Sequence, residues 1–323
     1  MSLLGPYVHD IDPVIGTIFG VHLWWYGLSY TLGFFNAFNF IKKRRRGLSL
    51  TESQVFDLTV LIAVCVLVGG RVVEVAFYEW EFYAENLALI PALWLGGMAS
   101  HGLLIGGLVA VWIFSRISGK PFLVMTDLLA APASFILGAG RIGNFVDGQI
   151  LGSVTDVAWA VKFPDAEGFR HPVVLYDGIK NLLIIPVLLI AGRRNLPAGF
   201  VTGLFLFLYS FLRIPIDIFR EYPTSLLGLA TGQALNIALS IVGVLVMILV
   251  YRLPRSHHDI AAAEEPEASG IRWRKIAFAS ILLFCLVIPS DWTQDIPGRY
   301  GHRHPGLVHS SVYPRISTEV ASE

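Results

Sequence analysis

Long apolar stretches recur along the chain, with short polar segments between them. Seven of them come near the roughly 20 residues that a helix needs to cross a bilayer. They cover 14–41, 55–78, 96–115, 122–139, 173–191, 199–219 and 232–251. An eighth stretch, 272–290, has a shorter apolar core, with Trp273 and Trp292 near its ends as interfacial anchors. The pattern predicts an all-α polytopic membrane protein of seven spans with an additional eighth.

Composition agrees with this prediction and limits the classes of function. Of the 323 residues, 54% are hydrophobic and only 15% are charged, which leaves too little polar surface for a soluble globule of this size. The formal net charge is zero, so bulk electrostatics give no argument for a nucleic-acid partner. Cys65 and Cys285 both lie inside apolar runs and are expected to be buried. A reacting thiol would therefore come from a substrate.

Basic residues are concentrated in alternate loops, which fixes an expected orientation. They are Lys42–Arg46, Arg116 with Lys120, Arg193 with Arg194, and Arg252 with Arg255 and Arg272–Lys275. Under the positive-inside tendency these loops are cytoplasmic and the N-terminus faces outward. Because no basic residue precedes Lys42, the first stretch lacks the start of a cleavable signal peptide and should remain in the mature protein.

The same reading divides the chain into four segments. We expect a transmembrane domain over 1–252, a cytoplasmic linker over 253–271, an extra transmembrane helix over 272–290 and an outer tail over 291–323. The linker is acidic and without an apolar face, which is typical of local disorder. The tail carries histidines, but their spacing matches no firm ligand motif, so no metal site is expected.

Seven charged or titratable residues in or next to the predicted spans fall near the outer leaflet. They are Arg71, Glu74, His101, Arg141, Arg213, Asp217 and Arg220. Such residues are costly in lipid unless they face a partner or a cavity. Their common depth predicts a polar chamber open to the outer leaflet; the alternative is a set of structural pairs, such as Arg213 with Asp217.

Arginines in this set are suited to an anionic headgroup. A guanidinium matches the geometry of phosphate, and two of them around one phosphate would stabilise a leaving group as its bond to carbon breaks. Arg141 and Arg213 are our choice for this pair. Arg71 and Arg220 either contact the same ligand or pair with acids at the rim of the chamber.

The span over 199–219 carries a polar stripe. Arg213, Asp217 and Arg220 are spaced to lie on one helical face, so Asp217 and Arg220 would share the site with Arg213. Pro215 among them removes one backbone hydrogen bond and is expected to kink the helix.

Two further side chains are candidates for chemistry. His101 lies among glycines, where it either takes a proton from a thiol or makes a structural bond to a carbonyl. Tyr26 either orients a substrate through its phenol or belongs to an interfacial aromatic belt.

The run Gly138–Gly152 places an arginine, an asparagine and an acid among glycines, and it closely resembles the signature segment of the prolipoprotein diacylglyceryl transferase family. Shorter motifs occur in the order of that family over about residues 10–252. They are Asp12–Ile15, Trp25–Leu28, Gly69–Arg71, Gly96–Met98, His101–Gly102, Arg170–Pro172, Leu175–Tyr176 and Gly232–Gln233.

The resemblance implies a seven-span enzyme of the bacterial inner membrane with a periplasmic cap, an active site toward the periplasm and no cofactor. Such an enzyme moves the diacylglyceryl group of phosphatidylglycerol to the lipobox cysteine of an exported preprolipoprotein, forms a thioether and releases glycerol phosphate. By position, the residues that match important family residues are Tyr26, His101, Arg141, Asn144 and Arg213. Arg141 matches the arginine that binds phosphatidylglycerol.

Within this framework we expect Arg141, Arg213 and Asn144 to hold the lipid, with Gly143 beside them. Asp147 joins His101 as a candidate to collect the thiol proton. Gln149 stands where the family usually has a glutamate, and Asp147, two residues away, would have to supply the missing charge.

Two other functions remain open at this point. The first is a divergent paralogue that keeps the lipid chamber but uses another acceptor or reaction, as Gln149 and the added tail allow. The second is a lipid-binding protein or transporter without chemistry, in which the same polar residues form a pathway.

Overall fold

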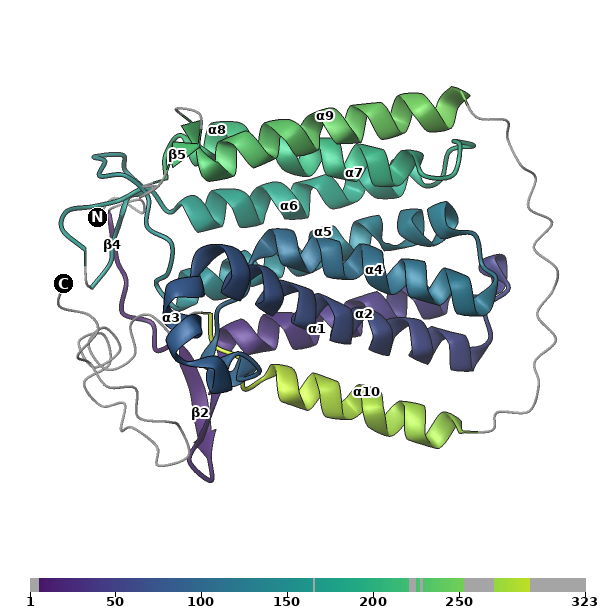
Figure 1. Ribbon diagram of the computed structural model, residues 1–323. Coiled ribbons are helices and arrows are strands. Elements are labelled where there is room, and N and C mark those ends of the chain that lie inside the picture. Colours follow the sequence, from purple (N-terminus) through teal and green to yellow (C-terminus); the bar gives the residue numbers. More distant parts are fainter. Residues whose placement is uncertain (1–5, 165, 221–224, 227–228, 253–269, 291–323) are drawn as a thin grey trace.

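The computed structural model describes residues 6–164, 166–220, 225–226, 229–252 and 270–290. Long helices run side by side in one bundle, with the short strands gathered at one end (Figure 1). The helices are α1 Trp25–Arg44, α2 Glu52–Val73, α3 Trp80–Glu85, α4 Ser100–Ser118, α5 Phe122–Val146, α6 Val173–Ala191, α7 Phe200–Phe211, α8 Ile214–Asp217, α9 Thr231–Arg252 and α10 Ile271–Cys285. A π-helical turn, Glu74–Tyr78, continues α2, and short 3-10 turns occupy Arg46–Leu48, Leu87–Leu89 and Leu93–Leu95.

The expected helical membrane class is confirmed. Six helical segments within the described chain are long and apolar enough to cross a membrane. They are Glu52–Tyr78, Ser100–Ser118, Phe122–Val146, Val173–Ala191, Phe200–Asp217 and Gly232–Arg252. Helices α1 and α10 lie alongside this group (Figure 1). The eight spans expected from the sequence stay a prediction for these two helices.

The first apolar stretch is not helical from its start, contrary to the expectation for 14–41. Strands β2 Val14–Ile18 and β3 Val21–Trp24 form an antiparallel hairpin, and the helix begins only at Trp25. Phe19 and Gly20 make the turn with φ angles of 49° and 80°. β-branched residues in the strands and a glycine at the turn favour a hairpin over a helix.

The signature segment also differs from expectation, because α5 continues through it to Val146 instead of ending near residue 139. Its glycines serve helix packing: a Cβ on Gly138 would lie 3.0 Å from the Leu182 side chain. The chain turns only afterwards, where Gly148 and Ile150 have φ angles of 66° and 62°. Arg141 and Asn144 are therefore held on the last turns of a helix, with their directions fixed.

The irregularity expected at Pro215 is present as a short turn at Leu212 and Arg213, which interrupts the α-helix. Helix α7 ends at Phe211, and Pro215 lies in the first turn of α8, where a missing N–H is tolerated. The break places Arg213 between two helical segments.

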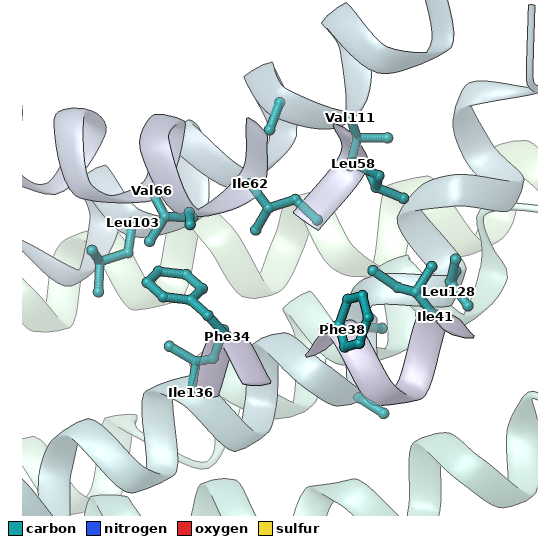
Figure 2. Packing of buried hydrophobic residues seen from close by; sticks show 14 of the residues in the cluster. Phe34, Phe38, Ile41, Leu58, Ile62, Val66, Leu103, Val111, Leu128 and Ile136 are labelled. Carbon is teal, nitrogen blue, oxygen red and sulfur yellow. The ribbon is translucent and has the colours of Figure 1, made fainter. Parts of the chain in front are cut away.

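The core lies where α1, α2, α4 and α5 meet. Figure 2 shows apolar side chains from these helices pointing toward one another, with Phe34 of α1 facing Ile62, Val66 and Leu103. Helices α2 and α4 approach closely, because a Cβ on Gly106 would lie 2.0 Å from the carbonyl oxygen of Cys65. An apolar cavity of about 100 Å³ remains among α1, α2, α4, α5 and α7.

Short strands tie loops together at the end of the bundle that also carries α3 and α8 (Figure 1). Strand β1 Tyr7–Val8 pairs in parallel with β4 Val161–Lys162, and β5 Ser225–Leu226 pairs with β6 Leu229–Ala230. The predicted tail, 291–323, and all of the predicted linker up to residue 269 lie outside the described residues.

Candidate active site

Two arginines from different parts of the chain meet at one buried carboxylate. Arg141 of α5 donates from Nε to Oδ2 of Asp177 at 2.7 Å. Nη1 of Arg213 lies 3.2 Å from the same oxygen. Asp177 lies near the start of α6, and Arg213 lies directly before α8. The structure thus brings together the two arginines that the sequence singled out.

A third cation belongs to this cluster. Nζ of Lys180 lies 2.8 Å from Oδ1 of Asp177 and donates to the carbonyl oxygen of Tyr209 at 2.9 Å. The Tyr209 hydroxyl in turn accepts from Nη1 of Arg213 at 3.3 Å. These contacts fix the Arg213 side chain from several directions.

Asp217 holds Arg213 from the other side. Nε of Arg213 lies 3.5 Å from Oδ1 of Asp217, and Asn236 of α9 donates to Oδ2 at 2.7 Å. Both acid and amide are buried. Asp217, which we expected among the lipid ligands, is thus placed as a support for Arg213.

Several charged side chains share this cluster. Arg141, Arg213 and Lys180 face the carboxylates of Asp177 and Asp217. The planar guanidinium groups of Arg141 and Arg213 match the geometry of phosphate. The cluster is therefore suited to bind an anionic group.

A second polar group adjoins Arg141 at the end of α5. Asn144 accepts from Nη1 of Arg141 at 3.2 Å and donates to the hydroxyl of Ser290. The N–H of Ser290 donates to Oδ2 of Asp147 at 3.0 Å. Asn144, Asp147 and Ser290 are all buried. The C-terminal apolar segment thus ends within the predicted site.

His101 lies in the first turn of α4, at the same end of the bundle. Gly96 and Gly97 precede it with φ angles of 76° and 78°, which let the chain reverse before the helix. Nε2 of His101 is buried and has no hydrogen-bond partner among the described residues. The imidazole is within electrostatic reach of Arg141, Arg213 and Asp217.

Tyr26 is buried at the start of α1 instead of lying in an exposed aromatic belt. Its hydroxyl is 3.0 Å from that of Tyr30, and the charges of Arg141 and Asp147 act on it. Gly143 packs against this tyrosine, because a Cβ on the glycine would lie 2.8 Å from Cα of Tyr26. Gly143 therefore brings α1 against α5, and a direct contact with lipid is not needed to explain it.

Arg71 has a different task from the one that we expected. It is only 3% exposed, and its guanidinium donates to main-chain carbonyls of the loop between α3 and α4. The acceptors are Leu89, Ile90, Ala92 and Gly96. Arg71 thus fixes a loop in this structure, and a contact between Arg71 and lipid stays a prediction.

Two other predicted residues lie at the margin of the cluster. Arg220 forms a β-bridge with Gly152 and is within electrostatic reach of Tyr78. Gln149 is buried, and its Nε2 finds no hydrogen-bond partner in the described part of the chain. Neither position tests the role given to it from the sequence.

Five residues of the site escaped the sequence reasoning: Asp177, Lys180, Tyr209, Asn236 and Ser290. Asp177 and Lys180 both interrupt the predicted span 173–191, and two charges in one span were a usable signal. Asn236 and Ser290 are uncharged and lie in apolar runs, so only the fold reveals them. No group of three or more residues able to hold a metal ion occurs among the described residues.

Comparisons with known proteins give the chain's relatives. The family model of prolipoprotein diacylglyceryl transferase matches residues 13–249. A phosphatidylglycerol–prolipoprotein diacylglyceryl transferase of Geobacter sulfurreducens is 37% identical over 251 residues, which cover 75% of this chain and 96% of that protein. Proteins with the same name from Pseudoalteromonas atlantica and Pseudomonas aeruginosa are 36% and 35% identical over 253 residues, or 75% of this chain and 90% and 95% of theirs.

Proposed function

The chain belongs to the prolipoprotein diacylglyceryl transferase family, and from this premise we propose that it transfers the diacylglyceryl group of phosphatidylglycerol to the lipobox cysteine of an exported prolipoprotein. One observation carries the proposal for the site: Arg141 and Arg213 converge on a single oxygen of Asp177. The multi-pass protein would work in the bacterial inner membrane, with this site toward the periplasm.

The arginines would hold the phosphate of the lipid. Its oxygens would compete with Asp177 for the guanidinium donors. As the reaction proceeds, negative charge grows on the departing phosphate oxygen, and fixed cations stabilise that charge more than they stabilise the bound substrate. Asn144, bonded to Arg141, would orient the headgroup.

The bond changes balance without a cofactor. The thiolate sulfur attacks the phosphate-bearing carbon of the diacylated glycerol, a C–S bond forms, the C–O bond to that carbon breaks, and glycerol phosphate leaves with the electron pair. We assign the thiol proton to His101, whose Nε2 has no other partner among the described residues. Bound phosphate would offset the repulsion that Arg141 and Arg213 exert on a protonated imidazole.

The apolar cavity provides a place for part of the lipid. It is lined by residues of the core, among them Leu103, Ile136 and Phe205, and has a volume of about 100 Å³. An apolar cavity favours hydrocarbon over water. Part of one acyl chain would occupy it while the headgroup lies at the arginines.

Replacing Arg141 tests this proposal. In membranes with equal amounts of protein, Arg141→Ala should reduce the thioether product by about 100-fold or more, because a main stabiliser of the leaving phosphate is lost. Arg116→Ala, which removes an exposed arginine of α4, is the matched control and should keep wild-type activity. Unchanged product in Arg141→Ala would contradict the role of this residue. Lipid binding without any product in the wild type would favour another acceptor or a non-catalytic protein.

A further inference from the structure

Helix α10 lies beyond the part of the chain that the family model matches, yet its end enters the candidate site. It packs against α1 and α2 along its length. Phe278 of α10 lies with its ring 4.9 Å from that of Phe38 and 6.1 Å from that of Phe56. Nearer the start of α10, Nε of Arg274 lies 2.6 Å from Oδ1 of Asp57. We call this surface of α1 and α2 the α10 seat.

In the outer half of the α10 seat, the contacts are made to main-chain carbonyl groups of α10 and of Leu286. Thr31 donates to the carbonyl oxygen of Leu282 at 2.8 Å, and the N–H of Trp24 donates to that of Leu286 at 2.9 Å. A Cβ on Gly27 would lie 2.3 Å from the carbonyl oxygen of Cys285. The glycine therefore lets the end of α10 come very close to α1. Main-chain contacts of this kind do not require one particular side-chain sequence.

Ser290 connects three parts of the site. Its hydroxyl accepts from Asn144, its N–H donates to Asp147, and its carbonyl oxygen accepts from the N–H of Gly97 at 3.3 Å. Asn144 is in turn bonded to Arg141. A hydroxyl is thus held one residue away from the arginine that we assign to the phosphate.

The sequence of this segment has the order of parts found in a signal peptide. Arg272, Arg274 and Lys275 come first, an apolar stretch over 276–289 follows, and the polar Ser290 ends it at the site. Signal peptides have a basic start, an apolar stretch of about 7–15 residues and a reacting end beyond it. By the positive-inside tendency the basic start is cytoplasmic, as it is in a signal peptide.

We propose that α10 with residues 286–290 is a tethered mimic of the substrate signal peptide, so that the α10 seat is the docking surface for that peptide. The inference rests on the proposed function. The Ser290 hydroxyl occupies the position of the acceptor thiol. A serine hydroxyl is a far poorer nucleophile than a thiolate, so the mimic stays unmodified. An incoming peptide has to displace it.

Giving the mimic a thiol tests the proposal in the full-length protein. Ser290→Cys should turn the segment into an acceptor: the introduced sulfur attacks the glycerol carbon of phosphatidylglycerol, glycerol phosphate leaves, and the thiol proton is taken up by His101. Mass spectrometry of a proteolytic digest should find one diacylglyceryl group at position 290. Ser280→Cys, on the exposed side of the same helix, is the matched control and should stay unmodified.

The outcomes separate this inference from the proposed function. Wild-type protein is assayed in parallel with a free lipobox peptide. If that peptide is modified but position 290 of Ser290→Cys is not, the proposed function stands and the mimic is contradicted. If no preparation modifies the free peptide, the proposed function fails and the inference falls with it.

A second test weakens the packing of α10 on its seat and measures the KM for the free peptide. Phe278→Ala removes a buried ring from the α10 seat, so the free peptide should meet less competition and its KM should fall about threefold or more. Leu283→Ala, which truncates an exposed side chain of α10, should leave the KM unchanged. If α10 were only a structural brace, Phe278→Ala would leave the KM for the peptide unchanged or raise it.

Discussion

Single charged residues dominate the chemistry of this protein, because so few of them lie inside the bundle. Arg141, Arg213 and Lys180 surround Asp177 at distances of 2.7 to 3.2 Å. Such buried groups rarely stabilise a fold better than apolar residues of similar size would. In the proposed function these groups are needed to bind an anionic headgroup.

Arg71 is also a buried arginine, but it holds the loop between α3 and α4 instead of joining the charged cluster. Arg71→Lys keeps the charge but cannot reproduce the fork of donors that holds four carbonyl groups, so the loop between α3 and α4 should loosen. We expect the Tm of the purified protein to fall by about 4 °C or more. At temperatures where both proteins are folded, the KM for phosphatidylglycerol should not change. A raised KM with an unchanged Tm would instead place Arg71 at the lipid site.

For individual residues, the sequence predicted that Arg141 and Arg213 lie together, but it did not predict that Asp177 connects them. The depth of Arg141 and Arg213 in their spans, together with the family motifs, was enough to pair them. Asp177 was overlooked because the stretch around it is otherwise strongly apolar. The tasks of Arg71 and Gly143 depend on backbone atoms far away in the sequence, which no local pattern contains.

Among the elements, the α2–α4 contact matters most for the site, because α4 carries His101 in its first turn. Glycines on both helices remove the side chains that would keep the backbones apart. A Cβ on Gly102 would lie 2.2 Å from the carbonyl oxygen of Gly69. Close backbone approach of this kind is the usual way in which membrane helices associate.

Neighbouring glycines of α4 provide a matched pair for testing this contact. Gly106→Ala should push α4 away from α2, since its Cβ would meet the carbonyl oxygen of Cys65 at 2.0 Å. We expect a loss of about 1–3 kcal/mol in the free energy of unfolding, together with reduced activity. Gly107→Ala meets only Val66 at 3.9 Å and should be neutral or stabilising, because alanine favours the helix. Thermal unfolding of both variants checks this, and equal effects would contradict the assigned contact.

Most elements were predictable from the sequence, and the exceptions have physical reasons. The predicted span 173–191 coincides with α6, and Pro215 marked the break between α7 and α8. The hairpin of β2 and β3 was missed because its residues are as apolar as the helix that follows, so hydropathy alone does not separate them. Strand and helix differ there in periodicity over too few residues to decide.

For the whole molecule, the bundle concentrates its polar chemistry at one end. Tyr26, His101, Arg141, Asp177 and Arg213 come from five different segments, each of which contributes a residue near its end at the strand-bearing side (Figure 1). Helices form most of this arrangement, because every backbone group in a membrane needs an internal hydrogen-bond partner and a helix supplies it within one segment. The apolar remainder of each helix is left to pack, to face lipid and to enclose the cavity.

The most direct test of this account uses purified full-length protein, a lipobox peptide and vesicles that contain phosphatidylglycerol, with the peptide mass as readout. We predict a gain of one diacylglyceryl group on the cysteine with the wild-type protein, and no gain with Arg141→Ala or with vesicles of phosphatidylcholine alone. An unmodified peptide with correctly folded wild-type protein, or equal modification by Arg141→Ala, would contradict it.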